Sequence, residues 1–115
     1  MAVILRRDTM ARYLFQGSYT LDGLKGLLRD GGSKRRAAAQ QVAQSVGGKL
    51  EAYYFSFGGD DVVGIVDLPD NVSAAAVSLI INAAGGFKLK TTVLLTPEEM
   101  DQATRKSVTY TPPGR

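Results

Sequence analysis

The segment from residue 50 to residue 68 constrains the fold more than any other part of the chain. It joins an aromatic run, residues 50–57, to a β-branched run, residues 62–68, through Gly58-Gly59-Asp60-Asp61. Aromatic and β-branched residues favour strands, and glycine and aspartate are typical of reversals in which φ is positive. We therefore predict a β-hairpin with a tight turn at residues 58–60.

Strand signals also occur on both sides of this hairpin. Tyr13, Phe15 and Tyr19 recur at even spacing within residues 11–19, and a period of two residues is that of a strand. A second run of β-forming residues, 87–95, lies nearer the C-terminus. Together with the hairpin, these segments predict four strands.

Three helical regions separate or follow the predicted strands, and the first of these regions is broken into two helices. Thr20 caps a leucine-rich helix that Gly31-Gly32 ends, and Ser33 caps a second helix that continues to about residue 46. A short C-terminal helix begins at Thr96-Pro97-Glu98-Glu99, which has the composition of a capping box with proline at the first position. The helix after the hairpin begins at Pro69-Asp70-Asn71 and is predicted to bury the side formed by Val72, Ala76, Leu79, Ile80 and Ala83.

The order of these elements predicts an α+β fold. A β-α-β-β-α-β order, with the first helix broken in two, is the ferredoxin-like arrangement, in which helices cover one face of a four-stranded antiparallel sheet. At 115 residues the chain is long enough for one domain with a proper core. We expect residues 1–9 to form an extension outside the core, residues 10–107 the single domain, and residues 108–115 an extended tail.

The composition narrows the chemistry that the chain can perform. Cysteine and histidine are both absent, which excludes disulfides, thiolate metal sites and the side chain that most often serves as a general base near neutral pH. We predict no metal site and no cofactor. The lack of cysteine suits a cytoplasmic location, and the apolar run at residues 2–5 is too short to cross a membrane.

The charges are divided unevenly along the chain. Residues 1–49 contain nine Lys and Arg and three acids, for a net charge of +6, whereas residues 50–115 contain five and eight, for a net charge of −3. Such asymmetry indicates an anionic partner or surfaces of opposite sign that meet within an oligomer. Nucleic acid is a less favoured partner, because the total of +3 is modest and no aromatic RNA-binding strand motif is present.

Both faces of the predicted sheet are apolar, which favours self-association. A continuous exposed apolar face is a liability, and its burial contributes roughly 25 cal/mol per Å². We expect a homo-oligomer, either a dimer or a multiple of dimers, unless the C-terminal helix folds back over the open face of a monomer. The residues predicted for the interface are Tyr13, Phe15, Tyr53, Phe55, Val63 and Ile65.

One segment combines the features of an anion site. Gly31-Gly32-Ser33-Lys34-Arg35-Arg36 places three cations in the first turn of a helix, where the dipole is already positive, so a bound anion or an acid from a partner subunit would stabilise them. Solvated cations at a helix start are the alternative. The residues predicted to bind a ligand are Tyr19, Lys25, Ser33, Arg35, Arg36 and Asp61.

Several segments together resemble the GYD-domain family of small bacterial proteins. The similar segments include residues 10–15, 18–20, 31–36, 47–52 and 95–99, and the resemblance covers about residues 10–114. The Gly-Tyr-Asp signature of the family aligns with Gly59-Asp60-Asp61, so this chain keeps the aspartate and lacks the tyrosine. The family is similar to the dimeric α/β-barrel proteins, whose paired ferredoxin-like units serve as monooxygenases, isomerases or ligand-binding modules.

Two functions are consistent with these patterns. The first is an oligomeric protein that binds a small, anionic molecule in a cleft between sheet and helices, with or without catalysis. The second is a non-catalytic regulatory or interaction module that acts through its self-assembled sheet and its basic N-terminal half.

Overall fold

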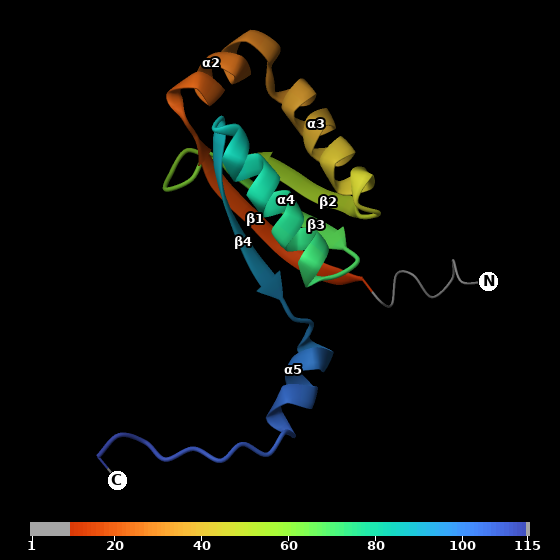
Figure 1. Ribbon diagram of the computed structural model, residues 1–115, viewed down its shortest axis with the longest axis vertical. Coiled ribbons are helices and arrows are strands. Elements are labelled where there is room, and N and C mark those ends of the chain that lie inside the picture. The colour runs from red at the N-terminus through yellow and green to blue at the C-terminus, as the bar shows by residue number, and fades with distance from the viewer. Residues whose placement is uncertain (1–9, 115) are drawn as a thin grey trace, which may run out of the picture.

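The computed structural model describes residues 10–114 and shows a four-stranded antiparallel sheet with helices on one face (Figure 1). The strands lie in the order β2-β3-β1-β4, which confirms the ferredoxin-like α+β fold. The predicted extension, residues 1–9, lies outside the described residues. In chain order the elements are β1 Ala11–Tyr19, α2 Leu21–Asp30, α3 Gly32–Ser45, β2 Lys49–Phe55, β3 Val62–Leu68, α4 Asn71–Ala84, β4 Phe87–Leu94 and α5 Pro97–Thr104.

Side-chain caps define most helix starts. Thr20 accepts the N–H of Gly23 at the start of α2, and Thr96 forms a capping box with Glu99 at the start of α5, as the sequence predicts. Ser33 does not cap α3, however, because it lies inside that helix. The cap is Gly31, which both ends α2 and precedes α3. Its φ is +83°, and its N–H donates to the Leu27 carbonyl.

The hairpin is present, but its turn is wider than the sequence predicts. Strand β2 ends at Phe55 and β3 begins at Val62, so residues 56–61 form a loop, and Gly58 and Gly59 do not adopt positive φ. The Ser56 N–H donates to the Asp61 carbonyl at 2.9 Å, and the Ser56 hydroxyl donates to the Asp60 carbonyl at 2.6 Å. These bonds close the loop without the left-handed glycine of a tight turn.

The core lies between the sheet and the helices α3 and α4. Tyr13, Val66 and Leu68 are the largest fully buried side chains, and Ala43 and Ala74 pack on them from the two helices. The Tyr13 hydroxyl donates a 2.7 Å hydrogen bond to Oδ1 of Asn71 at the start of α4. This bond fixes the N-terminal end of α4 on the sheet.

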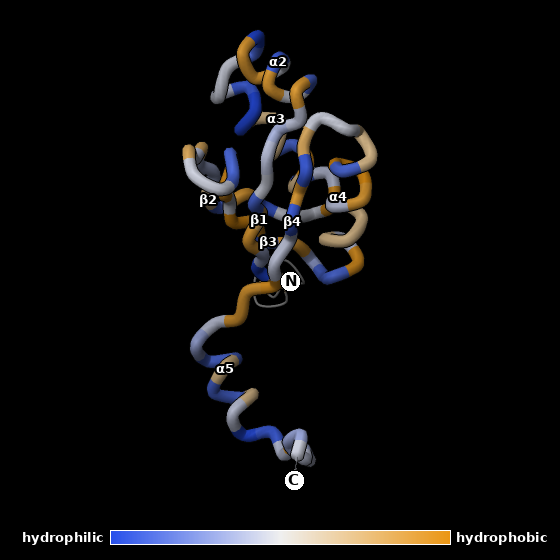
Figure 2. The backbone as a smooth tube through the Cα atoms, turned by 90° about the vertical axis from the view of Figure 1, so that its left-hand side faces the viewer, coloured by the Kyte–Doolittle hydropathy of each residue, from blue (hydrophilic) through white to orange (hydrophobic). Residues whose placement is uncertain are grey.

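The buried side of α4 differs from the prediction. Ala74 and Val77 are buried, whereas Val72, Leu79 and Ile80 are exposed. The small Ala74 side chain packs against the core cluster, which allows the helix to approach the sheet closely, so the bulkier residues face outward. An apolar outer surface on α4 is the consequence (Figure 2).

A β-bulge in β2 changes which of its side chains face the helices. The pairing of β2 with β3 shifts between Leu50 and Ala52, so the alternation of faces is interrupted at Glu51. Leu50 and Tyr53 therefore line the same cavity beneath α3. From the sequence alone, a strict alternation of faces along residues 50–57 would place Leu50 and Tyr53 on opposite faces, and the bulge makes this expectation wrong.

The opposite face of the sheet carries no helix. The register aligns Ala52, Ile65, Leu14 and Thr92 across the four strands at its centre. Helix α5 leaves the end of β4 and extends away from the sheet (Figures 1 and 2), so it does not cover this face as the monomer alternative requires. Within residues 10–114, no helix is long and apolar enough to cross a membrane.

Candidate ligand-binding site

A mainly apolar cavity lies between the sheet and helices α3 and α4. It has a volume of about 150 Å³ and opens partly to solvent. Its wall is mainly apolar, and its floor includes Gly64 on β3, where a Cβ would lie 2.9 Å from the carbonyl oxygen of Ala52. The lining residues come from both helices and all four strands, and they include Phe15, Val42, Leu50, Ile81, Phe87 and Leu89.

Three polar side chains also line this cavity. They are Tyr19 at the end of β1, Tyr53 in β2 and Arg35 in the first turn of α3. Burial raises the pKa of the Tyr53 hydroxyl, and the hydrogen bond with Tyr19 raises it further, whereas the charge of Arg35 lowers it. The three groups line one cavity, and the raised pKa makes Tyr53 a neutral hydrogen-bond donor at physiological pH.

Arg35 keeps part of its charge available to the cavity. Its nearest carboxylate is Asp30, with Nη1 4.0 Å from Oδ2, and the same carboxylate accepts a 3.2 Å hydrogen bond from Arg29. That bond is the largest cause of the lowered pKa of Asp30, to which the charges of Arg29, Lys34 and Arg35 also contribute. Three cations therefore share a single carboxylate, so the region where α2 meets α3 carries a net positive charge.

Phe87 closes the end of the cavity next to Tyr19. The two rings meet edge to face with their centroids 4.9 Å apart. Gly17 makes room for this arrangement, because a Cβ at that position would lie 2.5 Å from Cε2 of Phe87 and would also collide with the Lys88 carbonyl oxygen. A side chain at position 17 would displace the ring that borders the cavity.

Asp61 positions Tyr19 and does not face the main cavity. Its Oδ2 accepts the backbone N–H of Tyr19 at 3.0 Å, and its own N–H donates to the Gly17 carbonyl at 2.8 Å. These bonds tie the start of β3 to the end of β1, from which Tyr19 reaches the cavity. Asp61 also borders a shallower hollow together with Leu24, Phe55 and Phe57.

The six residues predicted to bind a ligand thus occupy different surroundings. Tyr19 and Arg35 line the main cavity. Ser33 and Arg36 line a separate, open hollow beside Tyr54 at the edge of the sheet. Lys25 is exposed on α2. Whether any of them binds a ligand stays a prediction.

The six residues predicted for the interface are divided between the two faces of the sheet. Tyr13, Phe15, Tyr53 and Phe55 lie on the helix-covered face, where Tyr13 is 1% exposed. Val63 and Ile65 lie on the open face, because they alternate with the buried residues of β3. A partner that docks on the open face therefore meets Val63 and Ile65, while Tyr13 and Phe15 belong to the core of one subunit.

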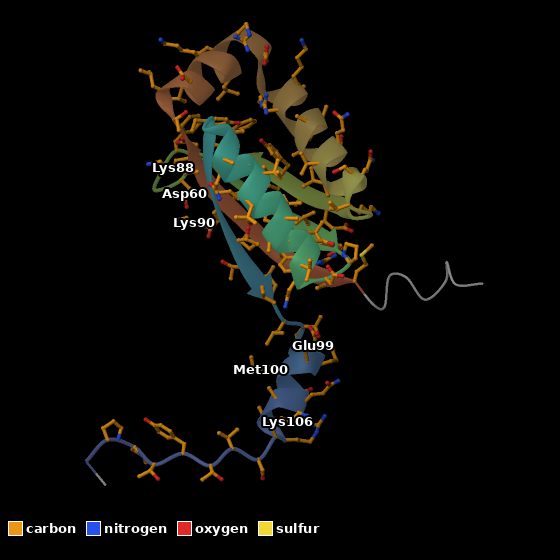
Figure 3. All side chains as sticks on the ribbon, in the orientation of Figure 1. Asp60, Lys88, Lys90, Glu99, Met100 and Lys106 are labelled. Atoms are coloured by element: carbon orange, nitrogen blue, oxygen red, sulfur yellow. The ribbon has the colours of Figure 1, made fainter. Side chains whose placement is uncertain are left out.

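Two ion pairs flank the apolar centre of the open face. The Arg12 guanidinium binds both oxygens of Asp67, at 2.7 and 3.0 Å, and this hydrogen bond is the main reason that the pKa of Arg12 is raised. The Lys90 ammonium lies 3.1 Å from Asp60, while Lys88 is exposed beyond it (Figure 3). The face thus has an apolar band with charged residues on both sides.

Sequence reasoning missed Tyr53 and the hydrophobic lining as parts of the site. The sequence predicts Tyr53 for the interface together with Tyr13, Phe15 and Phe55, because both faces of the sheet are apolar and the sequence does not indicate which one the helices cover. In the described part of the chain, no group of three or more acidic side chains is arranged to hold a metal ion.

Comparison with known proteins identifies the family of the chain. The sequence model of the GYD domain matches residues 13–104, which extend from within β1 to the end of α5. No curated protein and no solved structure shows a significant match. The match extends over most of the chain, 92 of its 115 residues. The chain belongs to the GYD-domain family.

Proposed function

We propose that this protein binds a small anionic molecule with an aromatic or branched apolar body in the cavity between the sheet and helices α3 and α4. The observation that carries the proposal is the convergence of Tyr19, Tyr53 and Arg35 on a cavity whose wall is otherwise apolar. Ligand sites typically combine such a wall with a few polar groups that orient the ligand. No reaction is assigned.

The size and chemistry of the cavity limit the ligand. An apolar cavity of about 150 Å³ accommodates a single aromatic ring, so a ring-bearing carboxylate or enolate fits and a nucleotide does not. Arg35 supplies the positive charge, and the Tyr53 phenol donates a hydrogen bond because its raised pKa keeps it protonated. These groups hold a ligand and give no general base that works at neutral pH.

The ligand proposal is tested by thermal shift. Benzoate, hydroxybenzoates and phenylpyruvate are compared with inorganic phosphate and a nucleotide, and a ligand at a hundred times its Kd stabilises the native state by about 2.7 kcal/mol. We expect an aromatic carboxylate to raise Tm, the R35Q variant to reduce the shift, and K88Q to retain it, since Lys88 is on the opposite side of β4. The proposal fails if no aromatic acid raises Tm, or if R35Q responds like the parent protein.

We also propose that the open sheet faces of two copies pack together. The support is the apolar band formed by Ala52, Ile65, Leu14 and the methyl group of Thr92, which no segment within residues 10–114 covers. Arg12 with Asp67 and Lys90 with Asp60 border this band, and a polar rim around an apolar centre is typical of interfaces. Analytical ultracentrifugation of the parent protein and of I65R tests the pairing, with a monomeric parent protein as the contradictory result.

The alternative function is a non-catalytic interaction module that acts through the assembled sheet and the basic N-terminal half. The absence of cysteine is the support for a cytoplasmic location in either case. The two functions differ in one result: the module forms the oligomer but shows no Tm shift with any aromatic acid, and A38L, which fills the cavity, leaves its association unchanged.

A further inference from the structure

The C-terminal arm, residues 95–110, has apolar side chains but little to pack against in its own subunit. Leu95, Met100, Val108 and Tyr110 are all at least half exposed, and Figure 3 shows Met100 and Glu99 on a helix well away from the sheet. Helix α5 has only eight residues, and isolated helices shorter than about 12 residues are marginal in water. Its capping box contributes to its stability, but a docking partner would contribute more.

The opposite end of the molecule carries the basic corner, which we define as Arg29, Lys34 and Arg35 around Asp30. These three cations share one carboxylate, and the first turn of α3 contains no acidic residue that would complement the positive end of the helix dipole. Leu28, which is 86% exposed, lies next to Arg29. The corner therefore combines excess positive charge with an uncovered apolar side chain.

The arm carries negative charge that complements the positive charge of the basic corner. Glu98, Glu99 and Asp101 give the first part of α5 three negative charges. Glu98 and Asp101 are three residues apart and thus lie on one side of the helix. Neither Glu98 nor Asp101 forms an ion pair within residues 10–114, since the ion pairs found there involve other acids.

The arm cannot reach the corner of its own subunit, because the two lie at opposite ends of the molecule (Figure 1). A two-fold axis that lies along the open sheet face and across its strands turns the second copy end to end. Each arm then lies at the end where the partner has its corner, and both contacts form at once, as in a closed isologous dimer. The same operation places the two open faces against each other.

We propose that the C-terminal arm of each copy docks on the basic corner of a second copy, with the acids of α5 facing Arg29 and Lys34. The proposal rests on the face-to-face dimer and goes beyond it, because it adds a second, charged contact at each end. It also gives the uneven charge of the chain, +6 before residue 50 and −3 after it, a role in fixing the direction in which the copies pair.

Charge reversal tests the docking by its effect on the dimer dissociation constant, measured by analytical ultracentrifugation of the full chain. Lys34→Glu places an acid in the first turn of α3, which favours the helix itself, so a weaker dimer would not arise from loss of that helix. Either reversal turns an attractive pair of exposed charges into a repulsive one, and each dimer contains two such contacts. We therefore expect K34E and D101K each to raise the Kd at least about tenfold. The double variant K34E/D101K should recover most of the parent affinity.

A second measurement locates the arm. The chain has no cysteine, so single cysteines can be labelled: a donor at Q102C on the arm is mixed with an acceptor at S33C beside the corner or, as a matched control, at V72C at the start of α4. All three positions are exposed. Because donor and acceptor are on different chains, energy transfer reports only contacts between copies, and we expect it to be stronger with S33C than with V72C.

The outcomes separate this proposal from the others. Energy transfer to V72C that equals or exceeds transfer to S33C would overturn arm docking. So would a double variant K34E/D101K whose increase in Kd is the combined effect of the two single variants, with no recovery of affinity. If the parent dimerises and I65R is monomeric while the reversals change nothing, the sheet pairing stands and the arm contact is refuted. A monomeric parent refutes both. Ligand binding is read independently, by the Tm shift with an aromatic acid.

Discussion

Replacement of Ala38 by leucine should stabilise the protein and abolish ligand binding, because this side chain lines the cavity. The change adds three carbons, each worth about 0.8 kcal/mol when fully buried, and ordering a leucine side chain costs about 0.5–1 kcal/mol. The net gain in the free energy of unfolding is therefore about 1.5 kcal/mol. For a domain of this length, such a gain corresponds to a rise in Tm of about 5–10 °C.

Ala37 supplies the matched control. It precedes Ala38 on the same helix but is exposed to solvent, so A37L makes the same chemical change without filling the cavity and should alter stability by less than about 0.5 kcal/mol. Urea denaturation of the parent and both variants measures the differences. A cavity already filled by the subunit's own side chains would make A38L destabilising by about 1–3 kcal/mol through overpacking, and this result would refute the reasoning.

Three further predictions concern residues around the cavity. D61A removes the carboxylate that accepts the Tyr19 N–H and should lower the free energy of unfolding by about 1 kcal/mol and weaken ligand binding; equal binding by D61A and the parent would contradict its positioning role. G17A should lower stability by at least about 1–3 kcal/mol because its Cβ meets the Phe87 ring, and an unchanged denaturation midpoint would show that the ring is not held there. The pKa of the Tyr53 phenol is higher in the folded state than the value of 10.0 expected in the unfolded state, so its contribution to stability is complete below pH 10 and is lost as the pH rises beyond it. Y53F should therefore show a shallower loss of Tm between about pH 9 and 11 than the parent protein. Identical profiles of Tm against pH would contradict the buried phenol.

The strands, most helix boundaries and the fold class could be predicted because their signals are local. Thr20 and Thr96 cap helices through hydrogen bonds to residues three positions later, so the pattern and the structure involve the same few residues. The wider loop at residues 56–61 was not predicted, because a Gly-Gly-Asp sequence permits a tight turn without requiring it.

The faces of the elements were harder to predict, because they depend on contacts between distant segments. The hydrophobic pattern of α4 offers two apolar sides, and the smaller Ala74 is buried because it fits against Tyr13 and its neighbours. Likewise, the bulge at Glu51 depends on the register with β3. Tyr53, Tyr19 and Arg35 meet at the cavity, although no spacing along the chain indicates this convergence.

The most direct test of the central claim is an NMR titration of the ¹⁵N-labelled protein with an aromatic carboxylate. If the ligand binds between the sheet and helices α3 and α4, the largest amide shifts should map to the residues around Tyr19, Arg35, Tyr53 and Phe87, which line the cavity. Amides on the open sheet face, such as that of Ile65, should shift far less. Shifts confined to the open face or to the outer side of α2 would contradict the account, as would a spectrum that does not change.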